Sequence, residues 1–539
     1  MKKRMVRLIA LALCCVMFAG CAQLQEVAEV LNDQWENQAI DVVSYDEMEY
    51  TRPDMQAVED AFDRACTAAA GDKLEIVIDR IWEFYDVYDR FFTDYSLADI
   101  RYCCDLTDEY WEAEYNFCAE NSARVDAMLE ELYYALAKSP CLPSLESPKY
   151  FGEGYFDSYQ GENNWDAEFT ALLEAESALV ARYYDLSAQT AAYESGSPEF
   201  YDACFEDMAQ VLVDLVDLRR EIAAYWGYED YNRFATDFYH YRDYDLDQTR
   251  DYLEQIRAEL VELYRQVNLS GIWDNGYSRA YEHQTYGYVK DMAKRMDGTV
   301  QEAFLVMDQG ELYDISYSEN KYNASFETYL TSYQEPFIFM NPTMTTYDYL
   351  TFAHEFGHFC NDYASGGSYA GVDVLEFFSQ GMEYLSLCYG EDTEHLTKMK
   401  MADSLCLYIE QAAFASFEMQ MYEIPEEELT VQALAELYDR VAQEYGFDSV
   451  SYDPREFITV THYYTNPLYI VSYVVSNDAA MQLYQLEKEN PGAGLKVFEE
   501  NLATQESYFL SFLESAGLRS PFDPERIREV KMTFAEILK

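Results

Sequence analysis

Apolar side chains recur at helical spacing along most of the chain. The segment 73–92, KLEIVIDRIWEFYDVYDRFF, has a set of apolar residues near the 3.6-residue period of an α-helix: Ile76, Ile78, Trp82, Tyr85 and Phe91. The pattern predicts helices from about 54 to 140 and again from 165 onward. Between them, KSPCLPSLESPKYFGEG at 138–154 is rich in Pro, Ser and Gly and indicates a lobe boundary.

Few stretches have the pattern of β-strands. ELYDISYS at 311–318 and PFIFMN at 336–341 carry β-branched and aromatic residues between turn signals. After residue 346 the pattern is again mostly helical. The segment 430–446 carries one apolar stripe, formed by Leu434, Leu437, Val441 and Tyr445. The segment ends in Gly446, a residue that favours the end of a helix. We therefore expect a mainly α fold with a small β-sheet. The sheet should lie next to the helical segment around residues 351–367, which follows the two predicted strands.

A chain of 539 residues is too long for one hydrophobic core. We expect four parts. Residues 1–20 form a signal peptide, 21–50 a polar lead-in, 51–199 an N-terminal helical lobe and 200–539 a catalytic region.

The first twenty residues have the pattern of a secretion signal, with four basic residues before a short apolar run. Phe18-Ala19-Gly20-Cys21 resembles a bacterial lipobox, in which Cys21 is acylated and becomes the first mature residue. The sequence thus predicts a lipoprotein on the extracytoplasmic side of a bacterial membrane. A plain cleaved signal peptide is the alternative.

The formal net charge is −63, and removal of the four basic signal residues leaves −67. Such a charge argues against nucleic acid as a partner, because phosphates would be repelled. Anionic lipid would be repelled too, so contact with a membrane should be through the lipid anchor alone.

Nine cysteines remain when Cys21 and the two cysteines of the signal peptide are set aside. A disulfide between cysteines of the N-terminal part is possible in an oxidising compartment. The sequence has no CxxC pair, so a zinc site built from thiolates is not expected.

The stretch TFAHEFGHFCNDYASGG, 351–367, contains an H-E-x-x-H motif. A helix from about 346 to 364 places His354 and His358 one turn apart on one face, where two imidazoles can bind Zn²⁺. Glu355 lies beside the first imidazole and can accept a proton from a metal-activated water. The alternative is a solvated helix face with two exposed histidines.

A catalytic zinc usually takes a third protein ligand. Asp362 lies on the same face, but successive turns of one helix do not converge on one ion, so it is the weaker choice. The next segment, DVLEFFSQGMEYLSL, can return antiparallel after the Gly-rich SGGSYAG. We assign Glu376 from this segment as the ligand and Glu383 as a residue that orients a ligand.

Several motifs in order resemble the M3 metallopeptidases, in particular the oligoendopeptidase F and Pz-peptidase branch. They are HEFGH with LEFFSQGMEYL, the segment 312–341 that closes in PFIFMN, the element THYYTNPLYIVSY at 461–473, and the segments 223–235 and 514–527. The resemblance covers roughly residues 200–530. It implies Glu376 as a ligand, one zinc per chain and a two-lobed helical body with a deep channel for short unfolded peptides. Asn323 and Ala324 depart from the Gly-Gly that the family often has after its lysine.

The element 462–473 supplies further candidates. Asn466 and Pro467 favour the cap and first position of a helix, which would set Tyr469 and Tyr473 on one face of its first turns. Agreement with the family's His and Tyr spacing implies that these tyrosines and His462 donate hydrogen bonds to the oxyanion that forms during peptide hydrolysis.

These features predict a zinc endopeptidase that hydrolyses internal bonds of oligopeptides. Two alternatives stay open. One is a catalytically silent, lipid-anchored peptide-binding protein, which has no need of Glu355. The other is a carboxypeptidase or dipeptidyl carboxypeptidase, which needs a basic residue to hold a terminal carboxylate.

Overall fold

The computed structural model describes residues 40, 42–161, 167–190, 193, 196–267, 269–273, 276–449 and 452–538. The expected signal peptide, the lipidation candidate Cys21 and most of the lead-in lie outside the described residues. The expected domain boundaries stay predictions.

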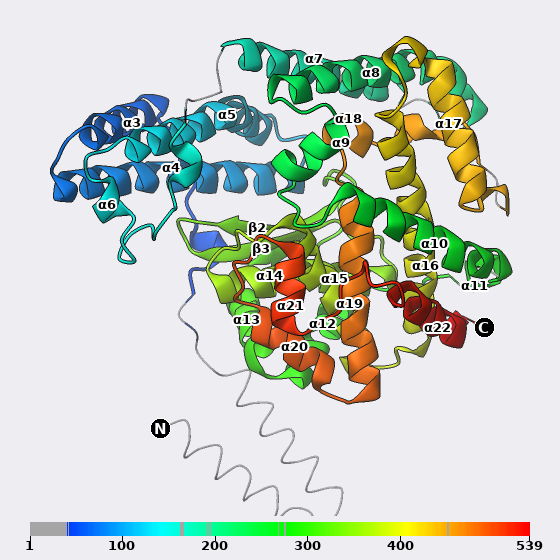
Figure 1. The fold of residues 1–539 in the computed structure, drawn as a ribbon. Coiled ribbons are helices and arrows are strands. Elements are labelled where there is room, and N and C mark those ends of the chain that lie inside the picture. Colours follow the sequence, from blue (N-terminus) through cyan, green and yellow to red (C-terminus); the bar gives the residue numbers. More distant parts are fainter. Residues whose placement is uncertain are drawn as a thin grey trace, which may run out of the picture.

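The N-terminal lobe consists of three long helices and one short one. They are α3 (Met55–Ala69), α4 (Leu74–Cys104), α5 (Glu109–Ala137) and α6 (Leu142–Leu145), and Figure 1 shows them beside the main body. The lobe has its own buried cluster, which runs from Val58 to Phe156 and so includes the Pro- and Ser-rich segment. The expected apolar stripe of α4 was partly wrong, because Ile76 and Trp82 are exposed whereas Val77 and Ile81 are buried.

The main body is helical and surrounds one large core. Two helices, α7 (Ala167–Gln189) and α8 (Pro198–Tyr225), pack on each other along one edge of it (Figure 1). The next elements are α9 (Tyr231–Phe234), the π-helical turn η3 (Ala235–Tyr239), α10 (Leu246–Gln266), α11 (Leu269–Trp273), α12 (Glu282–Met296) and α13 (Gly298–Gln309). The later ones are α16 (Glu394–Met421), α17 (Val431–Glu444), α18 (His462–Thr465), α19 (Val471–Glu489), α20 (Ala493–Asn501), α21 (Phe509–Ala516) and α22 (Arg526–Leu538). The expected stripe of α17 is confirmed, since all four of its apolar residues are buried.

A three-stranded sheet lies against the helix of the H-E-x-x-H motif. Its order is β1-β3-β2, with β1 (Tyr313–Asp314) parallel and β2 (Ser325–Leu330) antiparallel to β3 (Glu335–Met340). The sequence pattern predicted β1 and β3 but not β2. β2 forms the edge of the sheet nearest the N-terminal lobe, where Ser96 Oγ of α4 lies 3.3 Å from Thr328 Oγ1.

A buried lysine joins the loop between β1 and β2 to the sheet. Lys321 Nζ donates to the Asp314 carboxylate at 3.0 Å, the Ser316 carbonyl at 2.8 Å and the Met340 carbonyl at 2.9 Å. Lys321 is 4% exposed, so these oxygens replace the water that its ammonium loses. Burial opposes the charge on Asp314, but hydrogen bonds from Ser316 and the nearby Lys321 hold its pKa below the usual value.

Two adjacent helices carry the H-E-x-x-H motif and the segment that follows it. They are α14 (Tyr347–Ser365) and α15 (Val372–Tyr389). Gly357, inside the H-E-x-x-H motif, permits their close approach, since a Cβ there would lie 2.4 Å from the Phe378 carbonyl oxygen. Gly366 ends α14 in the left-handed conformation with φ 73°, which confirms the expected stop.

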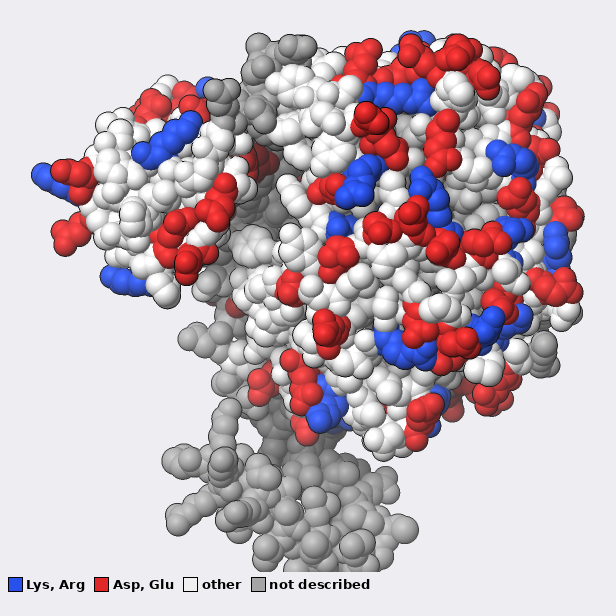
Figure 2. All heavy atoms as spheres, viewed as in Figure 1, with Lys and Arg blue, Asp and Glu red and all other residues white. Residues whose placement is uncertain are grey.

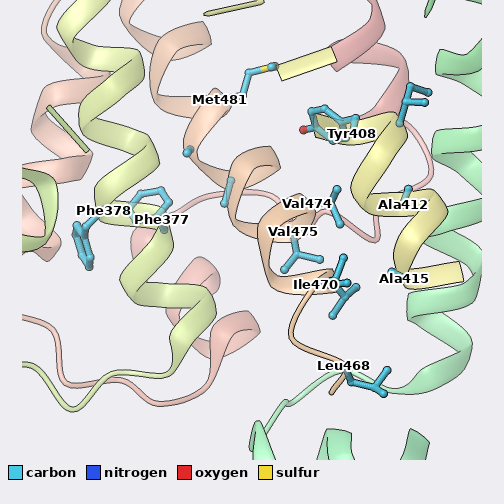
Figure 3. Close-up of a cluster of buried hydrophobic side chains, with 14 of the residues drawn as sticks. Phe377, Phe378, Tyr408, Ala412, Ala415, Leu468, Ile470, Val474, Val475 and Met481 are labelled. Atoms are coloured by element: carbon cyan, nitrogen blue, oxygen red, sulfur yellow. The ribbon is translucent and has the colours of Figure 1, made fainter. Parts of the chain in front are cut away.

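The helix α15 is held against α19 and α16 by a shared apolar core. Figure 3 shows Phe377 and Phe378 of α15, Val474 and Val475 of α19 and Tyr408 of α16 in this cluster. All five are buried, which gives α14 and α15 a rigid support. This support matters because the candidate ligands lie on these two helices.

The surface is strongly acidic, and Figure 2 shows Asp and Glu side chains spread over both lobes with fewer Lys and Arg between them. Among the described residues, no helix has the combination of length and apolar character needed to cross a lipid bilayer. The described cysteines are all free, so no disulfide joins them.

Candidate metal centre

The two histidines of the motif lie one turn apart on the same face of α14. Their ring centroids are 5.2 Å apart. Asp348 fixes the turn before α14, because its carboxylate accepts from the Thr343 N–H at 2.8 Å and the Thr345 N–H at 3.1 Å. The helix thus begins almost where the sequence predicted, although Thr346 caps it without a side-chain hydrogen bond.

Glu376 of α15 completes a cluster with the two histidines. The ligand atoms of His354, His358 and Glu376 all lie within 4.8 Å of one another, and Glu376 Oε2 is 3.7 Å from His354 Nε2. Ser379 donates to Glu376 Oε2 at 3.0 Å, which orients the carboxylate. Asp362 is not part of this cluster; its carboxylate accepts from the Ser368 N–H at 2.8 Å and closes the turn after α14.

The far nitrogen of His354 is held by Glu383. His354 Nδ1 donates to Glu383 Oε1 at 2.9 Å, so Nε2 is the nitrogen that faces Glu376 and can bind a metal. Burial disfavours charge on His354, but the hydrogen-bonded Glu383 raises its pKa to about 9. Burial lowers the pKa of His358 to about 4, so that this imidazole is neutral.

Glu383 is itself held by a lysine that the sequence analysis did not single out. Lys400 of α16 donates to Glu383 Oε2 at 2.7 Å and is 6% exposed. Burial opposes ionisation of Glu383, but Lys400 and His354 lower its pKa, so it stays a carboxylate. His354, Glu383 and Lys400 therefore form one hydrogen-bonded chain that ends in a buried cation.

Glu355 lies between the cluster and the sheet. It is 6% exposed, and burial raises its pKa. The nearby His354 and a hydrogen bond from Ser325 of β2 offset part of this rise. A carboxylate with a raised pKa beside a metal site is suited to accept and return a proton.

The second group of candidates approaches from the segment before α19. Tyr469 OH lies 3.4 Å from Glu376 Oε1, and the His462 ring stacks on the Tyr469 ring with centroids 5.6 Å apart. His462 Nε2 is 3.2 Å from the Tyr473 hydroxyl. Thus the structure brings His462, Tyr469 and Tyr473 together and sets Tyr469 against a candidate ligand.

The local backbone differs from the expected helix start at Asn466. α18 ends at Thr465, α19 begins at Val471, and Leu468 between them has φ 61°. A non-glycine residue in this region is strained, so other contacts must hold it. The buried Glu418 accepts from the Leu468 N–H at 2.9 Å, and His240 Nε2 donates to the Pro467 carbonyl at 2.8 Å.

Two buried neighbours decide where Tyr469 points. Leu468 and Ile470 are 3% and 1% exposed, and Figure 3 shows both beside the apolar cluster. Because both of its neighbours are anchored in the core, Tyr469 is left facing the metal cluster. A buried arginine of α8, Arg219, also supports α18 through bonds of 2.6 Å to the Tyr463 carbonyl and 2.5 Å to the Tyr464 carbonyl.

The donor set fits a zinc ion. Two imidazole nitrogens and one carboxylate oxygen leave room for water in a tetrahedral site, as at catalytic zinc centres. The bond from His354 to Glu383 is the outer contact that metal-bound histidines usually have. A cavity of about 510 Å³ borders the cluster through Tyr469. Another cavity, of about 530 Å³, is formed by α3, α4 and the turn between them and borders none of the site residues.

Comparison with known proteins agrees with the overall fold. Residues 45–164 match the family model described as the peptidase M3 N-terminal domain. No curated protein matches the chain by sequence. Among solved structures, Pz peptidase A with an inhibitor is similar with a TM-score of 0.77 and 20% identity, over 92% of this chain and 99% of that chain.

Two other solved structures show the same likeness. One, described as an oligoendopeptidase F from Bacillus anthracis, has a TM-score of 0.75 and 20% identity over 93% of this chain and 98% of its own. An oligoendopeptidase F from Enterococcus faecium has a TM-score of 0.56 and 15% identity, with 90% and 96% covered. The expected fold class, mainly α and two-lobed with a small sheet beside the motif helix, is confirmed. Residues 45–164 are therefore similar to the peptidase M3 N-terminal domain, and the chain as a whole has the fold of the Pz-peptidase and oligoendopeptidase F structures.

Proposed function

We propose that the protein is a zinc-dependent endopeptidase that hydrolyses internal bonds of short, unfolded peptides. The observation that carries the proposal is the convergence of His354, His358 and Glu376, with Glu355 buried beside them. Bound there, zinc would act as a Lewis acid on the peptide carbonyl and would lower the pKa of a water molecule. One such ion per chain is expected, since the described residues contain one cluster of this kind.

Glu355 acts as the general base and then as the general acid. It accepts a proton from the attacking water and passes it to the amine that leaves when the C–N bond breaks. Its buried position, between the cluster and Ser325 of the sheet, supports this role because it keeps bulk water from the carboxylate.

Tyr469, Tyr473 and His462 stabilise the negative charge that grows on the carbonyl oxygen. Burial raises the pKa of both tyrosines, and that of Tyr473 to about 12, so both hydroxyls keep their protons at neutral pH. A protonated hydroxyl at this place can donate to the oxyanion. The free edge of β2 would bind the peptide main chain as an added strand, which tolerates varied sequences.

Two observations bear on the alternatives. A silent peptide-binding protein has no use for a buried carboxylate next to the ligands, and Glu355 has that position. A carboxypeptidase needs a cation for the terminal carboxylate, and the described residues that line the cavity beside Tyr469 include no lysine or arginine. Both observations favour the endopeptidase.

The test is to incubate the purified protein with a mixed library of 6–15-residue peptides and map the products by mass spectrometry. Internal cleavage that stops when a strong chelator is added supports the proposal. Stepwise loss of C-terminal residues or dipeptides would replace it with the carboxypeptidase alternative. Binding without cleavage would replace it with the peptide-binding alternative.

A further inference from the structure

A cavity lined by tyrosines lies directly beside the candidate metal centre. Five tyrosine rings contribute to its walls, from the segment after α9, the loop between α14 and α15, the turn before α19 and the segment before α21: Tyr239, Tyr241, Tyr369, Tyr469 and Tyr508. Its volume is about 510 Å³, and we call it the tyrosine pocket.

Three of these rings are largely exposed to solvent, so they contribute little to the hydrophobic core. Tyr241, Tyr369 and Tyr508 are 61%, 82% and 48% exposed. Within the part of the chain that the structure describes, these three rings pack on no other aromatic ring. Exposed large aromatic side chains that gather around one cavity indicate a binding site more often than a structural need.

The tyrosine pocket is continuous with the catalytic groups. Tyr469 forms part of its wall and also donates to Glu376 Oε1 across 3.4 Å. A side chain in the pocket would therefore belong to a residue next to the bond that is cleaved. Tyr469 lines the pocket and also lies at the metal cluster. A side chain bound in the pocket would therefore contact the tyrosine that stabilises the oxyanion.

The pocket has an uncharged lining. Besides the tyrosines, it is formed by small or apolar residues, one serine and His240. Burial, followed by the nearby Arg242, lowers the pKa of His240 to about 3, so this imidazole is neutral. No cation among the described lining residues could pair with an acidic side chain, and Asp89 of α4 and Glu130 of α5 lie close to Tyr369 and Tyr241. An acidic side chain would therefore be disfavoured.

Two rings of the tyrosine pocket lie near residues of the N-terminal lobe. Tyr369 lies close enough to Asp89 of α4 and to Tyr155 for both to act electrostatically on its hydroxyl. Tyr241 likewise lies close to Glu130 of α5 and to Tyr508. These rings therefore face the N-terminal lobe across the space that a peptide has to enter.

We propose that the tyrosine pocket is a subsite for an aromatic side chain of the peptide, on a residue that flanks the cleaved bond. The inference rests on the proposed peptidase function and adds the class of side chain that is selected. Aromatic rings offer flat apolar area and edge-to-face contacts that tyrosine walls can satisfy. We expect roughly tenfold or greater preference in kcat/KM for Phe or Tyr over Ala at that residue, and a larger one over Asp.

The experiment uses an internally quenched peptide series that differs at one residue, with Phe, Ala, Lys or Asp on either side of the cleaved bond. Ser507→Trp fills the pocket from an exposed position in its lining, and Tyr508→Ala removes one wall. Tyr110→Ala is the matched control, because Tyr110 is 56% exposed but belongs to neither the pocket nor the metal cluster. Both pocket variants should lower the Phe-to-Ala ratio toward one, whereas the control should keep it.

Binding to Glu355→Gln separates this inference from the proposed function. Fluorescence titration of that variant with the Phe and Asp peptides should show tighter binding of the Phe peptide, reduced by Ser507→Trp. If the Phe peptide binds selectively but the wild-type protein cleaves nothing, the subsite stands and the peptidase proposal fails. If peptides are cleaved without preference for Phe, with a preference for Lys, or with a preference that Ser507→Trp leaves intact, the subsite proposal is overturned.

Discussion

His354 Nδ1 lies 2.9 Å from Glu383 Oε1, and this bond connects a candidate zinc ligand to the core of the protein. The other oxygen of Glu383 accepts from Lys400 at 2.7 Å. A carboxylate fixed at both ends holds the imidazole ring in one orientation, with its Nε2 toward the metal cluster. The geometry of the metal centre therefore depends on a lysine that contacts neither the metal cluster nor the cavity beside it.

Lys400→Met and Glu383→Gln should weaken zinc binding by roughly 10–100-fold, because each loosens the support of His354. Competition with a chromophoric chelator measures that affinity directly, without reference to activity. Lys398→Met is the matched control on the same helix, since Lys398 makes no ion pair with Glu383 among the described residues. Unchanged zinc affinity in both variants would show that Glu383 is not a support for the ligand.

Tyr469→Phe and Tyr473→Phe should each lower kcat by roughly 10²-fold or more, as expected for the loss of one oxyanion donor. His462→Ala should impair turnover as well, because its imidazole stacks on Tyr469 and lies 3.2 Å from the Tyr473 hydroxyl. Steady-state kinetics on one quenched peptide, with zinc content and thermal unfolding measured in parallel, separates a catalytic loss from a folding defect. Near-normal kcat/KM in all three variants would make this cluster structural.

Glu410 should make the folded state less stable as pH rises. Burial, with Glu456 and Asp403 nearby, raises its pKa from 4.5 to about 7. The unfolded chain ionises Glu410 first, so stability falls between about pH 4.5 and 7, and the loss is complete above that range.

Glu410→Gln has no carboxylate to ionise and should not lose stability in this way. The unfolding free energy of the variant minus that of the wild type should be about 1–3 kcal/mol larger at pH 8 than at pH 4.5. Urea unfolding at the two pH values gives the difference. Glu514→Gln, at an exposed position with no ion pair among the described residues, is the control and should have equal effects at both. An equal effect of Glu410→Gln at both pH values would contradict the assigned pKa.

We further propose that the mature protein begins at an acylated Cys21, which would hold it on the outer face of a bacterial membrane. Intact-mass analysis of detergent-extracted protein should show a diacylglyceryl mass on that residue. Cys21→Ser should release the protein from the membrane fraction. A mature N-terminus at any other residue would refute the anchor.

Much of the site could be predicted because its pattern is local. His354, Glu355 and His358 share one helical segment, and Glu376 lies on the next helix after a glycine-rich turn. Helical periodicity is sufficient to place such residues on one face. Gly357 belongs to the same local pattern, but its reason is visible only in the contact with Phe378.

Other parts of the site depend on contacts between distant segments. Lys400 and Glu418 lie on α16 with the spacing of an ordinary polar face, and only the fold shows that Glu383 and Leu468 are their partners. The Asn466-Pro467 pair has the pattern of a helix start. The helix begins later, because Leu468 is held in a left-handed conformation by Glu418.

The strand β2 was missed for a related reason. In its sequence, SFETYL, alternate residues point to the same face, but two of the residues on the face toward α14, Ser325 and Glu327, are polar. Ser325 bonds to Glu355, and Glu327 is close enough to Glu355 and Asp362 for their charges to raise its pKa beyond the effect of burial. A strand that presents polar groups to the candidate metal centre lacks the apolar alternation by which strands are recognised.

The most direct test of the account is Glu355→Gln, with zinc content and peptide cleavage measured on the same preparation. Glu355 is not among the residues that converge as ligands, so the variant should keep one zinc per chain. His358→Ala is the paired control and should lose the metal. Glu355→Gln should lower kcat by about 10²–10⁴-fold at unchanged zinc content. Full activity in Glu355→Gln, or wild-type cleavage that strong chelators do not affect, would contradict it.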